Sequence, residues 1–359
     1  MKEEQFSWLD GNSSRDLAIW REAWETLPER PPHYHPVFVR VMAPLDRHPT
    51  AAFYKGTRGS SVLYPFWLGK LGVLEGCPTD LVEYCDIVSP YGYGGPLYQG
   101  PQVQRETTVC EFRRLFRVAC REHRVVSEFV REDLFRTDLV EDDGARVYCQ
   151  DNVVVRLGLG EEAQLDRYDR KVRKNIRRAK EEGLSVVFDE RAQRLDESVD
   201  VYHDTMRRVR ARQYFFFGRS VFNELLVGLG PGRGAMLVHV LDGNRVVSTE
   251  LLLCSRHRLY SFLGGTRQES KWKRPNDLLK HEIILWGGKM GFESYVLGGG
   301  AKPRDGIFRF KEAFDPGSTM PFFTRQRIHD SETYQRLVRT RRAAIREAQP
   351  SDFFPAYRD

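Results

Sequence analysis

The order of strand-like and helix-like segments between residues 184 and 327 constrains the fold more than any other feature of this chain. Some segments repeat apolar residues at helical spacing, whereas others are short β-rich runs bounded by turn residues. The predicted elements are, in order, a strand at 184–188, helices at 195–209 and 219–229, strands at 235–241, 245–253 and 258–264, a helix at 276–290, a strand at 294–299, a helical turn near 305–314 and a strand at 321–327. Asp242-Gly243-Asn244 predicts a hairpin between the first two of the three successive strands. This alternation predicts a mixed α/β sheet.

The first half of the chain carries a shorter version of the same order. Its predicted elements are a helix at 16–27, hairpin strands at 51–55 and 62–68, a loop rich in Gly, Pro and Tyr at 85–101, a helix at 105–123 and a strand at 125–131. The second half opens with a strand at 152–157 and a basic helix at 166–182. A length of 359 residues also favours two domains. We therefore predict two related domains, 1–150 and 151–330, with the tail of 331–359 packing back on the first.

Composition excludes wholesale disorder and leaves the class of partner open. Hydrophobic residues make up 41% of the chain, which is enough for one or two cores. The 56 basic and 50 acidic residues leave a formal net charge of +6. That excess is compatible with an anionic partner such as RNA but does not require one.

The cysteines and apolar runs predict a cytoplasmic protein without a metal site. None of the six cysteines forms a C-x-x-C pair or stands at zinc-ligand spacing with a histidine, so we expect reduced thiols and no metal. The N-terminal MKEEQFSWLDG lacks the basic-then-apolar order of a signal peptide. No apolar run approaches the roughly 20 residues that span a bilayer, so we expect no membrane insertion.

Four stretches carry a resemblance to a known family. They are SPYGYGGP (89–96), RKVRKNIRRAKEEG (170–183), RPNDLLKHEIILWGGKMGF (274–292) and YVLGGGAKPRDGIFRFKEAFDP (295–316). With them, the chain resembles the Fem family of aminoacyl-tRNA-dependent non-ribosomal peptidyl transferases. The resemblance implies an α/β fold of two tandem GNAT-like acyltransferase domains, and the element order from residue 184 is that of the GNAT fold. It also implies transfer of an aminoacyl group from aminoacyl-tRNA to an amine of a cell-wall precursor or a small peptide-like acceptor, with no cofactor.

The resemblance implies that Phe310 and Lys311 lie at the reaction centre. A fixed ammonium near the developing oxyanion would lower the barrier to acyl transfer by a few kcal/mol. The alternatives are a solvated surface lysine at 311 and a core-filling ring at 310. Gly298, Gly299 and Gly300 would let a substrate approach the backbone closely, or would form a tight turn. Asp305 is better suited to cap the next helix than to contact substrate.

Two further groups of residues are candidates for substrate contact. The basic helix presents Arg173, Lys174, Arg177 and Arg178, which suit the phosphates of a tRNA; the alternative is a solvated face paired with acidic neighbours. Tyr91 and Tyr93 would line the acceptor site in the first domain, or would pack as part of a connector.

Two other functions compete with aminoacyl transfer. An N-acetyltransferase would use acetyl-CoA, whose pyrophosphate needs a Gly-rich cradle at a helix N-terminus. The junction GGTRQESKWKRPND (264–277) has no G-x-G before the helix that we expect Asn276 to cap, and GLGPGRG (228–234) precedes a strand. A non-catalytic binding protein of the same fold is the third possibility. We expect His281, on that same helix, at the surface or its boundary.

Overall fold

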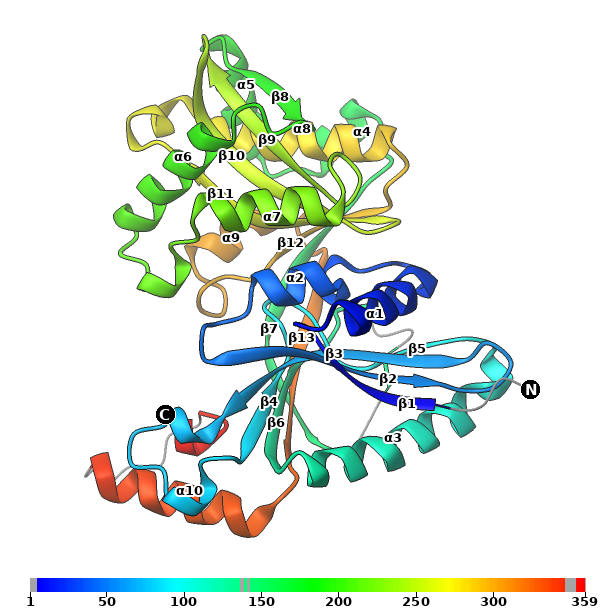
Figure 1. The fold of residues 1–359 in the computed structure, drawn as a ribbon. Coiled ribbons are helices and arrows are strands. Elements are labelled where there is room, and N and C mark those ends of the chain that lie inside the picture. Colours follow the sequence, from blue (N-terminus) through cyan, green and yellow to red (C-terminus); the bar gives the residue numbers. More distant parts are fainter. Residues whose placement is uncertain (1–4, 136–138, 141–142, 346–352, 359) are drawn as a thin grey trace. The chain divides into compact units, whose positions relative to one another are not determined.

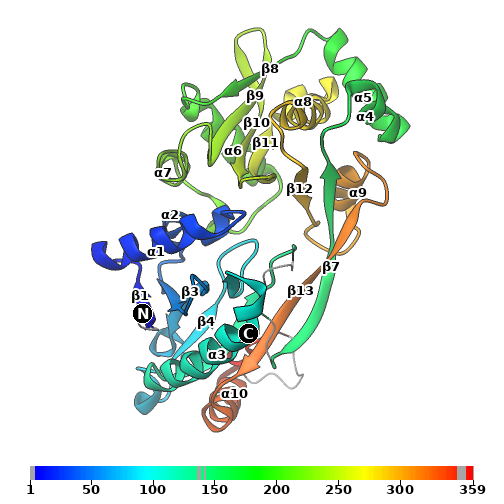
Figure 2. The same cartoon turned by 90° about the vertical axis from the view of Figure 1, so that its right-hand side faces the viewer.

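The computed structural model describes residues 5–135, 139–140, 143–345 and 353–358 (Figures 1 and 2). It forms two compact units: the first comprises residues 1–149 and 322–359, and the second comprises residues 150–321. The chain enters the second unit within β7 (Ala145–Arg156) and returns to the first within β13 (Thr319–Ile328).

The first unit is a mixed sheet with helices packed against it. Its helices and strands are β1 (Gln5–Asp10), α1 (Ser14–Thr26), α2 (Pro36–Val41), β2 (Arg47–Lys55), β3 (Ser61–Lys70), β4 (Cys85–Val88), β5 (Leu97–Gln99), α3 (Arg105–Glu122), β6 (Val125–Arg131) and α10 (Ser331–Ile345), with 3₁₀ turns η1 (Pro32–Tyr34), η2 (Leu71–Val73), η3 (Thr79–Leu81), η4 (Gln102–Gln104) and η7 (Ala356–Arg358). The strand order is β1-β2-β3-β4-β6-β13, with β5 paired to β3. Phe112 and Phe116 of α3 pack on Tyr64 and Phe66 of β3, so aromatic rings fill much of this core.

Four features of the first unit differ from, or add to, the sequence prediction. The strands β4 and β5 lie within residues 85–101, which were predicted to form a loop. The strand β1 was not predicted; it pairs antiparallel with β2 and turns Phe6 and Trp8 toward the aromatic core. The strand at 321–327 was expected to complete the second half, but β13 pairs antiparallel with β6 over residues 324–328. The tail helix α10 and η7 bury Tyr334 and Tyr357 in a cluster with Val126 of β6. Residues 346–352 and 359 of the tail lie outside the described part of the chain.

The second unit repeats this architecture. Its helices and strands are α4 (Glu161–Arg167), α5 (Arg170–Glu181), β8 (Ser185–Asp189), α6 (Leu195–Arg208), α7 (Arg219–Leu229), β9 (Ala235–Asp242), β10 (Arg245–Cys254), β11 (Arg258–Thr266), α8 (Pro275–Lys289), β12 (Ser294–Gly298) and α9 (Gly306–Glu312), with η5 (Gln213–Phe215) and η6 (Gln268–Lys273). The strand order is β7-β12-β11-β10-β9-β8. The predicted basic helix is divided into α4 and α5 because Asp169 caps α5, its carboxylate accepting from the Lys171 amide at 2.8 Å.

The two units share one order of elements and one pairing scheme. Each has a strand, two helices, three antiparallel strands, a helix and a strand that lies parallel to the third of the three. In the first unit the parallel pair is β4 and β6, and in the second it is β11 and β12. The prediction of an α/β fold with two tandem GNAT-like domains is confirmed.

The parallel strands of the second unit form a fork. β11 and β12 pair only from Arg258 to Tyr260 and from Ser294 to Val296. Beyond this ladder β11 continues beside β10, whereas β12 continues beside β7. The carboxyl ends of the two strands therefore separate, and ligands of open α/β sheets bind at such strand ends. None of the described helices is both long and apolar enough to cross a membrane.

Candidate active site

A buried polar network joins α8 to β10, β11 and β12. The Lys280 ammonium of α8 donates to the Glu250 carboxylate of β10, to the Ser261 hydroxyl at 2.8 Å and to the Tyr295 hydroxyl at 3.0 Å. The Tyr295 hydroxyl in turn donates to Glu250. Lys280 and Glu250 are 5% and 3% exposed, so this is an ion pair largely removed from water.

Sequence reasoning missed this network. Burial and the adjacent Glu250 carboxylate raise the pKa of the Tyr295 phenol well above its usual range, so the phenol stays protonated as a donor. One signal was available: Lys280 directly follows Leu279 and precedes Ile283 by three positions, within the apolar part of α8. A charged residue at such a position needs a buried partner. No local pattern identifies Glu250 as that partner.

Lys311 lies on α9, the short helix that follows the glycine segment. Its ammonium donates to the Gly299 carbonyl at 2.6 Å, which ties α9 to the chain just beyond β12. The Lys311 side chain is half-buried rather than a solvated surface lysine. Phe310 is also half-buried, packs on the core of the unit, and meets the Phe314 ring edge-on with centroids 5.4 Å apart.

The electrostatic setting of Lys311 links it to the buried network. Burial and the positive charge of Lys280 lower the pKa of Lys311 to about 8, against opposing contributions from Glu250 and Asp305. A lysine with this pKa still carries an ammonium in most molecules at neutral pH. It is therefore a cation with an unusually labile proton, held by a backbone carbonyl.

The backbone conformation and close packing of the loop require glycine at all three positions. Gly298 has a φ of +78°, which disfavours other residues. A Cβ on Gly299 would lie 2.5 Å from the Gln150 amide nitrogen, and one on Gly300 would collide with the Asp305 carboxylate. Contact with substrate stays a prediction for all three, since crowding and backbone conformation already account for these glycines.

Asp305 organises the turn between the glycines and α9. Its carboxylate accepts from the backbone amides of Ala301 at 2.9 Å, Lys302 at 3.1 Å and Phe308 at 2.8 Å. Hydrogen bonds from the backbone therefore lower the pKa of Asp305. The expected capping role is present: Asp305 is the N-cap of α9.

The four basic candidates on α5 are not equivalent. The Arg173 guanidinium donates to the carbonyls of Leu165 at 3.2 Å and Tyr168 at 2.9 Å, so it caps the C-terminus of α4. The Arg178 guanidinium lies over the Trp272 ring, 5.2 Å from its centroid.

Lys174 and Arg177 are exposed. They are the two of the four candidates best placed to meet an external anion.

The tyrosine loop belongs to the first unit, whereas Lys311 belongs to the second. Tyr93 is 8% exposed, and its ring meets His33 edge-on at 5.2 Å and Phe322 at 5.7 Å. It therefore packs in the core of its unit. Tyr91 is 37% exposed and is the one of the pair that a ligand can reach.

The start of α8 differs from the prediction at two residues. The helix begins at Pro275, preceded by Arg274 with a φ of 64°, so Asn276 is not its cap. His281 is fully buried, not at the surface, and its Nδ1 lies 3.2 Å from the Tyr168 hydroxyl. Burial lowers the pKa of His281 to about 4, which keeps the ring neutral at neutral pH. The sequence misled because α8 is buried on most of its circumference, polar positions included.

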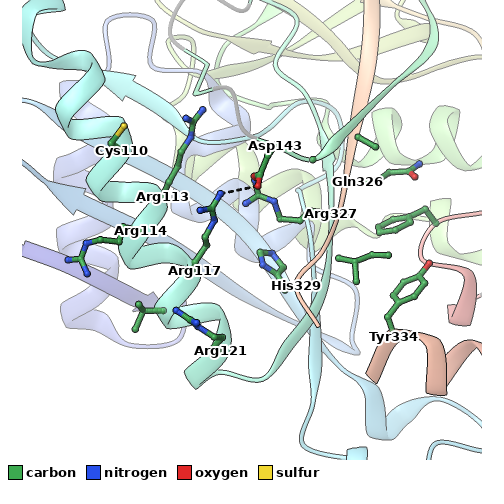
Figure 3. Close-up of a pocket in the computed structure, with 15 residues that line it drawn as sticks. Cys110, Arg113, Arg114, Arg117, Arg121, Asp143, Gln326, Arg327, His329 and Tyr334 are labelled. Atoms are coloured by element: carbon green, nitrogen blue, oxygen red, sulfur yellow. Dashed lines mark hydrogen bonds and ion pairs between the residues drawn. The ribbon is translucent and has the colours of Figure 1, made fainter. Parts of the chain in front are cut away.

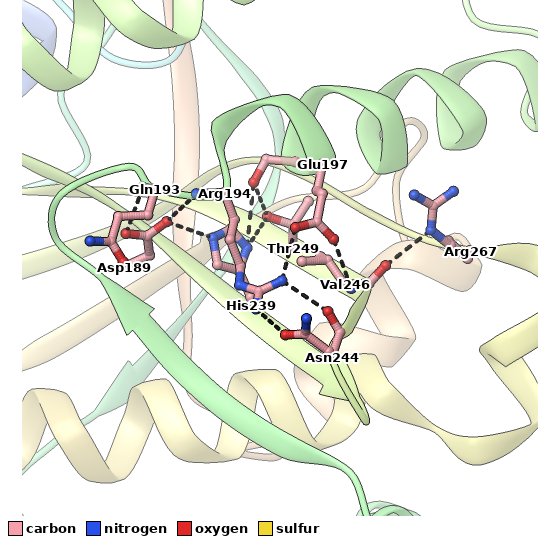
Figure 4. Close-up of polar contacts among 10 residues, drawn as sticks. Asp189, Gln193, Arg194, Glu197, His239, Asn244, Val246, Thr249 and Arg267 are labelled. Carbon is pink, nitrogen blue, oxygen red and sulfur yellow. Dashed lines mark hydrogen bonds and ion pairs between the residues drawn. The ribbon is translucent and has the colours of Figure 1, made fainter.

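A second polar cluster resembles a catalytic triad (Figure 4), but its serine and histidine are buried. The His239 ring lies 3.3 Å from Asp189 through Nε2, and 3.0 Å from Thr249 and 3.4 Å from Ser198 through Nδ1. The Ser198 and His239 side chains are fully buried. A nucleophile must meet its substrate, so this cluster instead joins α6 to β9 and β10.

Among the residues that the structure describes, no group of three His, Cys, Asp or Glu side chains could hold a metal ion.

Comparison with known proteins supports the fold. Residues 166–312 match the family described as acetyltransferase (GNAT) domain. A crystal structure of FemX is similar at a TM-score of 0.65 and 11% identity, over 93% of this chain and 99% of that one. The C-terminal domain (DUF2156) of a putative lysylphosphatidylglycerol synthetase from Agrobacterium fabrum is similar at 0.56 and 15% identity, over 89% and 94%. A conserved protein of unknown function from Bacteroides thetaiotaomicron VPI-5482 is similar at 0.53 and 10% identity, over 86% and 96%. No curated protein matches the chain significantly in sequence.

The family match thus assigns residues 166–312 to an acyltransferase domain of the GNAT fold. The whole chain shares with FemX a fold of two tandem GNAT-like domains.

Proposed function

We propose that this protein transfers an aminoacyl group from aminoacyl-tRNA to an amine of a cell-wall precursor or a small peptide-like acceptor. The observation that carries the proposal is the position of Lys311: a half-buried cation, tied to the Gly299 carbonyl beyond the end of β12. The motif around it, and the likeness of the whole chain to FemX, support this donor class.

In this mechanism the neutral amine attacks the ester carbonyl of the donor. A C–N bond forms, the C–O bond to the ribose breaks, and the proton lost by the amine ends on the released ribose hydroxyl. Lys311 donates a hydrogen bond to the oxyanion of the tetrahedral intermediate, where one good donor is worth about 3–4 kcal/mol. The buried Lys280–Glu250 pair acts on Lys311 through charge, since Lys280 lowers the pKa of Lys311 and Glu250 raises it.

The start of α8 supports tRNA over acyl-CoA as the donor. Pro275 removes one backbone donor from the first turn, and the buried Asp277 carboxyl, bonded to the Asn175 amide at 2.9 Å, lies in that same turn. A pyrophosphate at this helix N-terminus would meet a carboxyl group and one fewer N–H group. The match to an acetyltransferase (GNAT) domain keeps acetyl-CoA as the second candidate.

The state of the cysteines bears on the compartment. All six cysteines are free thiols, as is usual in a reducing compartment. We therefore propose a cytoplasmic protein.

A donor assay tests the proposed function. Purified protein is incubated with radiolabelled aminoacyl-tRNA pools or with acetyl-CoA, each in the presence of amine acceptors that include peptidoglycan precursors. We expect transfer of label from tRNA to an acceptor as an amide stable to mild base. Consumption of acetyl-CoA alone would establish the acetyltransferase, and binding without consumption of either donor would favour a non-catalytic protein.

The rate should depend on pH through Lys311. Because the ammonium is the active form and its pKa is about 8, kcat should fall as pH rises through 8. The arginine of Lys311→Arg stays charged over the whole pH range, so the kcat of this variant should not fall as the pH rises through 8. The measurement is a pH–kcat profile, with spontaneous ester hydrolysis measured without enzyme. A wild-type rate that keeps rising above pH 9 would contradict the role of the ammonium.

The exposed cations of α5 should contribute to tRNA binding. In Lys174→Gln/Arg177→Gln, the slope of log Kd for tRNA against log salt should decrease by about one per lost phosphate contact. Lys180→Gln serves as a control, because Lys180 lies on the same helix but is paired with Glu161 at 3.3 Å. An unchanged slope in the double variant would make this helix an ordinary solvated face.

A further inference from the structure

The first unit contains a groove lined by arginines, between α3 and β13 (Figure 3). Its volume is about 1140 Å³. The charged residues that line it are Arg113, Arg114, Arg117, Arg121, Arg327 and Asp143. Of the described lining residues, only Asp143 is acidic, so the groove has a strong excess of positive charge.

Three of the arginines form a ladder along one side of α3. Arg113, Arg117 and Arg121 recur every four residues, which at 1.5 Å per residue separates successive members by about 6 Å along the helix. Like charges at this spacing destabilise a helix by about 0.2–0.5 kcal/mol per pair. The ladder therefore costs stability unless an anion lies against it.

The described residues neutralise this charge only in part. Asp143 is shared by Arg117, at 3.0 Å, and Arg327, and Arg114 pairs with Glu111 of its own helix at 3.0 Å. Arg113 and Arg121 have no hydrogen bond or ion pair from their side chains in the described part of the chain, and the Arg113 Nε is buried without a partner. A buried donor without an acceptor is unfavourable by about 1–3 kcal/mol, which an incoming anion would relieve.

We propose that this arginine groove binds the phosphate backbone of RNA. A row of cations spaced along a helix suits a chain of phosphates better than a single headgroup, which would need the side chains to converge. The groove also exceeds the roughly 300–1,000 Å³ of most small-molecule pockets. Every cation named in it is an arginine, whose planar fork matches phosphate oxygens in pairs. The inference rests on the proposed function only in taking tRNA as the RNA.

An anionic membrane surface suits the groove less well. Peripheral membrane binding combines charge with exposed apolar side chains that enter the lipid. Among the described residues that line the groove, Ile328 is the only large apolar side chain that is well exposed, at 40%.

The test measures binding of uncharged tRNA, so its outcome is separate from that of the donor assay. In Arg113→Gln/Arg121→Gln we expect the affinity at low salt to fall at least about tenfold, and the salt slope to decrease by about two. Arg207→Gln/Arg219→Gln is the matched control: it removes the same charge from exposed helix arginines that already pair with Asp204 and Asp196. Thermal unfolding of both variants checks that each is folded.

Three results would overturn the proposal. The groove variant could bind tRNA as wild type does, or the control could lose as much affinity as the groove variant. The groove variant could also lose binding to phosphatidylglycerol vesicles while keeping its affinity for tRNA, which would make the groove a lipid site.

Cys110 allows a second, direct measurement. Its exposed thiol lies on the wall of the groove formed by α3 (Figure 3). A photoactivatable group attached there should crosslink to tRNA, and Cys110→Ser should abolish that adduct. A label on Cys110 that yields no RNA adduct, while the protein is saturated with tRNA, would place the RNA elsewhere.

Discussion

Replacing Lys311 with Met lowers turnover at least about a hundredfold and leaves the fold intact. The expected size follows from the loss of one oxyanion donor, about 10²–10³ in kcat. Methionine keeps most of the aliphatic packing, so the stability change should be limited to the lost hydrogen bond to Gly299, about 1 kcal/mol. The measurement is kcat with the donor identified by the donor assay, together with a urea unfolding curve.

Lys302→Met is the matched control for this variant. Lys302 lies in the same loop but its side chain is exposed. Its contact with Asp305 is made by the backbone amide. We expect its turnover to stay within about twofold of wild type, since an exposed lysine away from the reacting atoms contributes little. Near-normal turnover in Lys311→Met would remove Lys311 from the mechanism, whatever the control shows.

Removing the Lys280 ammonium should destabilise the second unit by about 3–5 kcal/mol. Lys280→Met leaves the Glu250 carboxylate in a site that is 3% exposed, without its counter-ion. Breaking one partner of a buried ion pair has an effect of this size, because the remaining charge has lost its solvation and its partner. The free energy of unfolding is measured by urea titration followed by fluorescence and circular dichroism.

Two further variants distinguish the effect of a buried, unpaired charge on stability from the effect of lost packing. Glu250→Gln/Lys280→Met removes both charges and should recover most of the lost stability. Lys273→Met breaks a more exposed pair with Asp242, 2.6 Å apart, and should lower the free energy of unfolding by no more than about 1 kcal/mol. A double variant as unstable as Lys280→Met alone would mean that packing, and not charge, dominates this site.

The sequence pointed to part of the candidate site but not to the buried polar network beside it. The segment 295–316 identified Phe310, Lys311 and the glycines from the order of residues along the chain. The glycines proved to be explained by their own turn, and the buried network around Lys280 was not foreseen. Glu250, Lys280 and Tyr295 come from different elements, so only the pairing of strands and the packing of α8 place them together.

The order of elements was determined by the sequence alone. Apolar spacing, turn residues and capping side chains act over a few positions, so the alternation of helices and strands from residue 184 could be read without a structure. Two tandem domains followed from repetition of that order. Such local signals specify what each segment forms, and not which distant segment it meets.

Tertiary structure decided which segments pair and which charges are buried. β13 lies beside β6 although nearly the whole second unit separates them in sequence. That pairing brings Arg327 to the ladder of Arg113, Arg117 and Arg121, and so creates the arginine groove. The burial of His281 and of the Lys280–Glu250 pair likewise depends on what packs against α8. Contacts between residues far apart in the chain set the local dielectric and the available partners, and therefore decide which side chains can do chemistry.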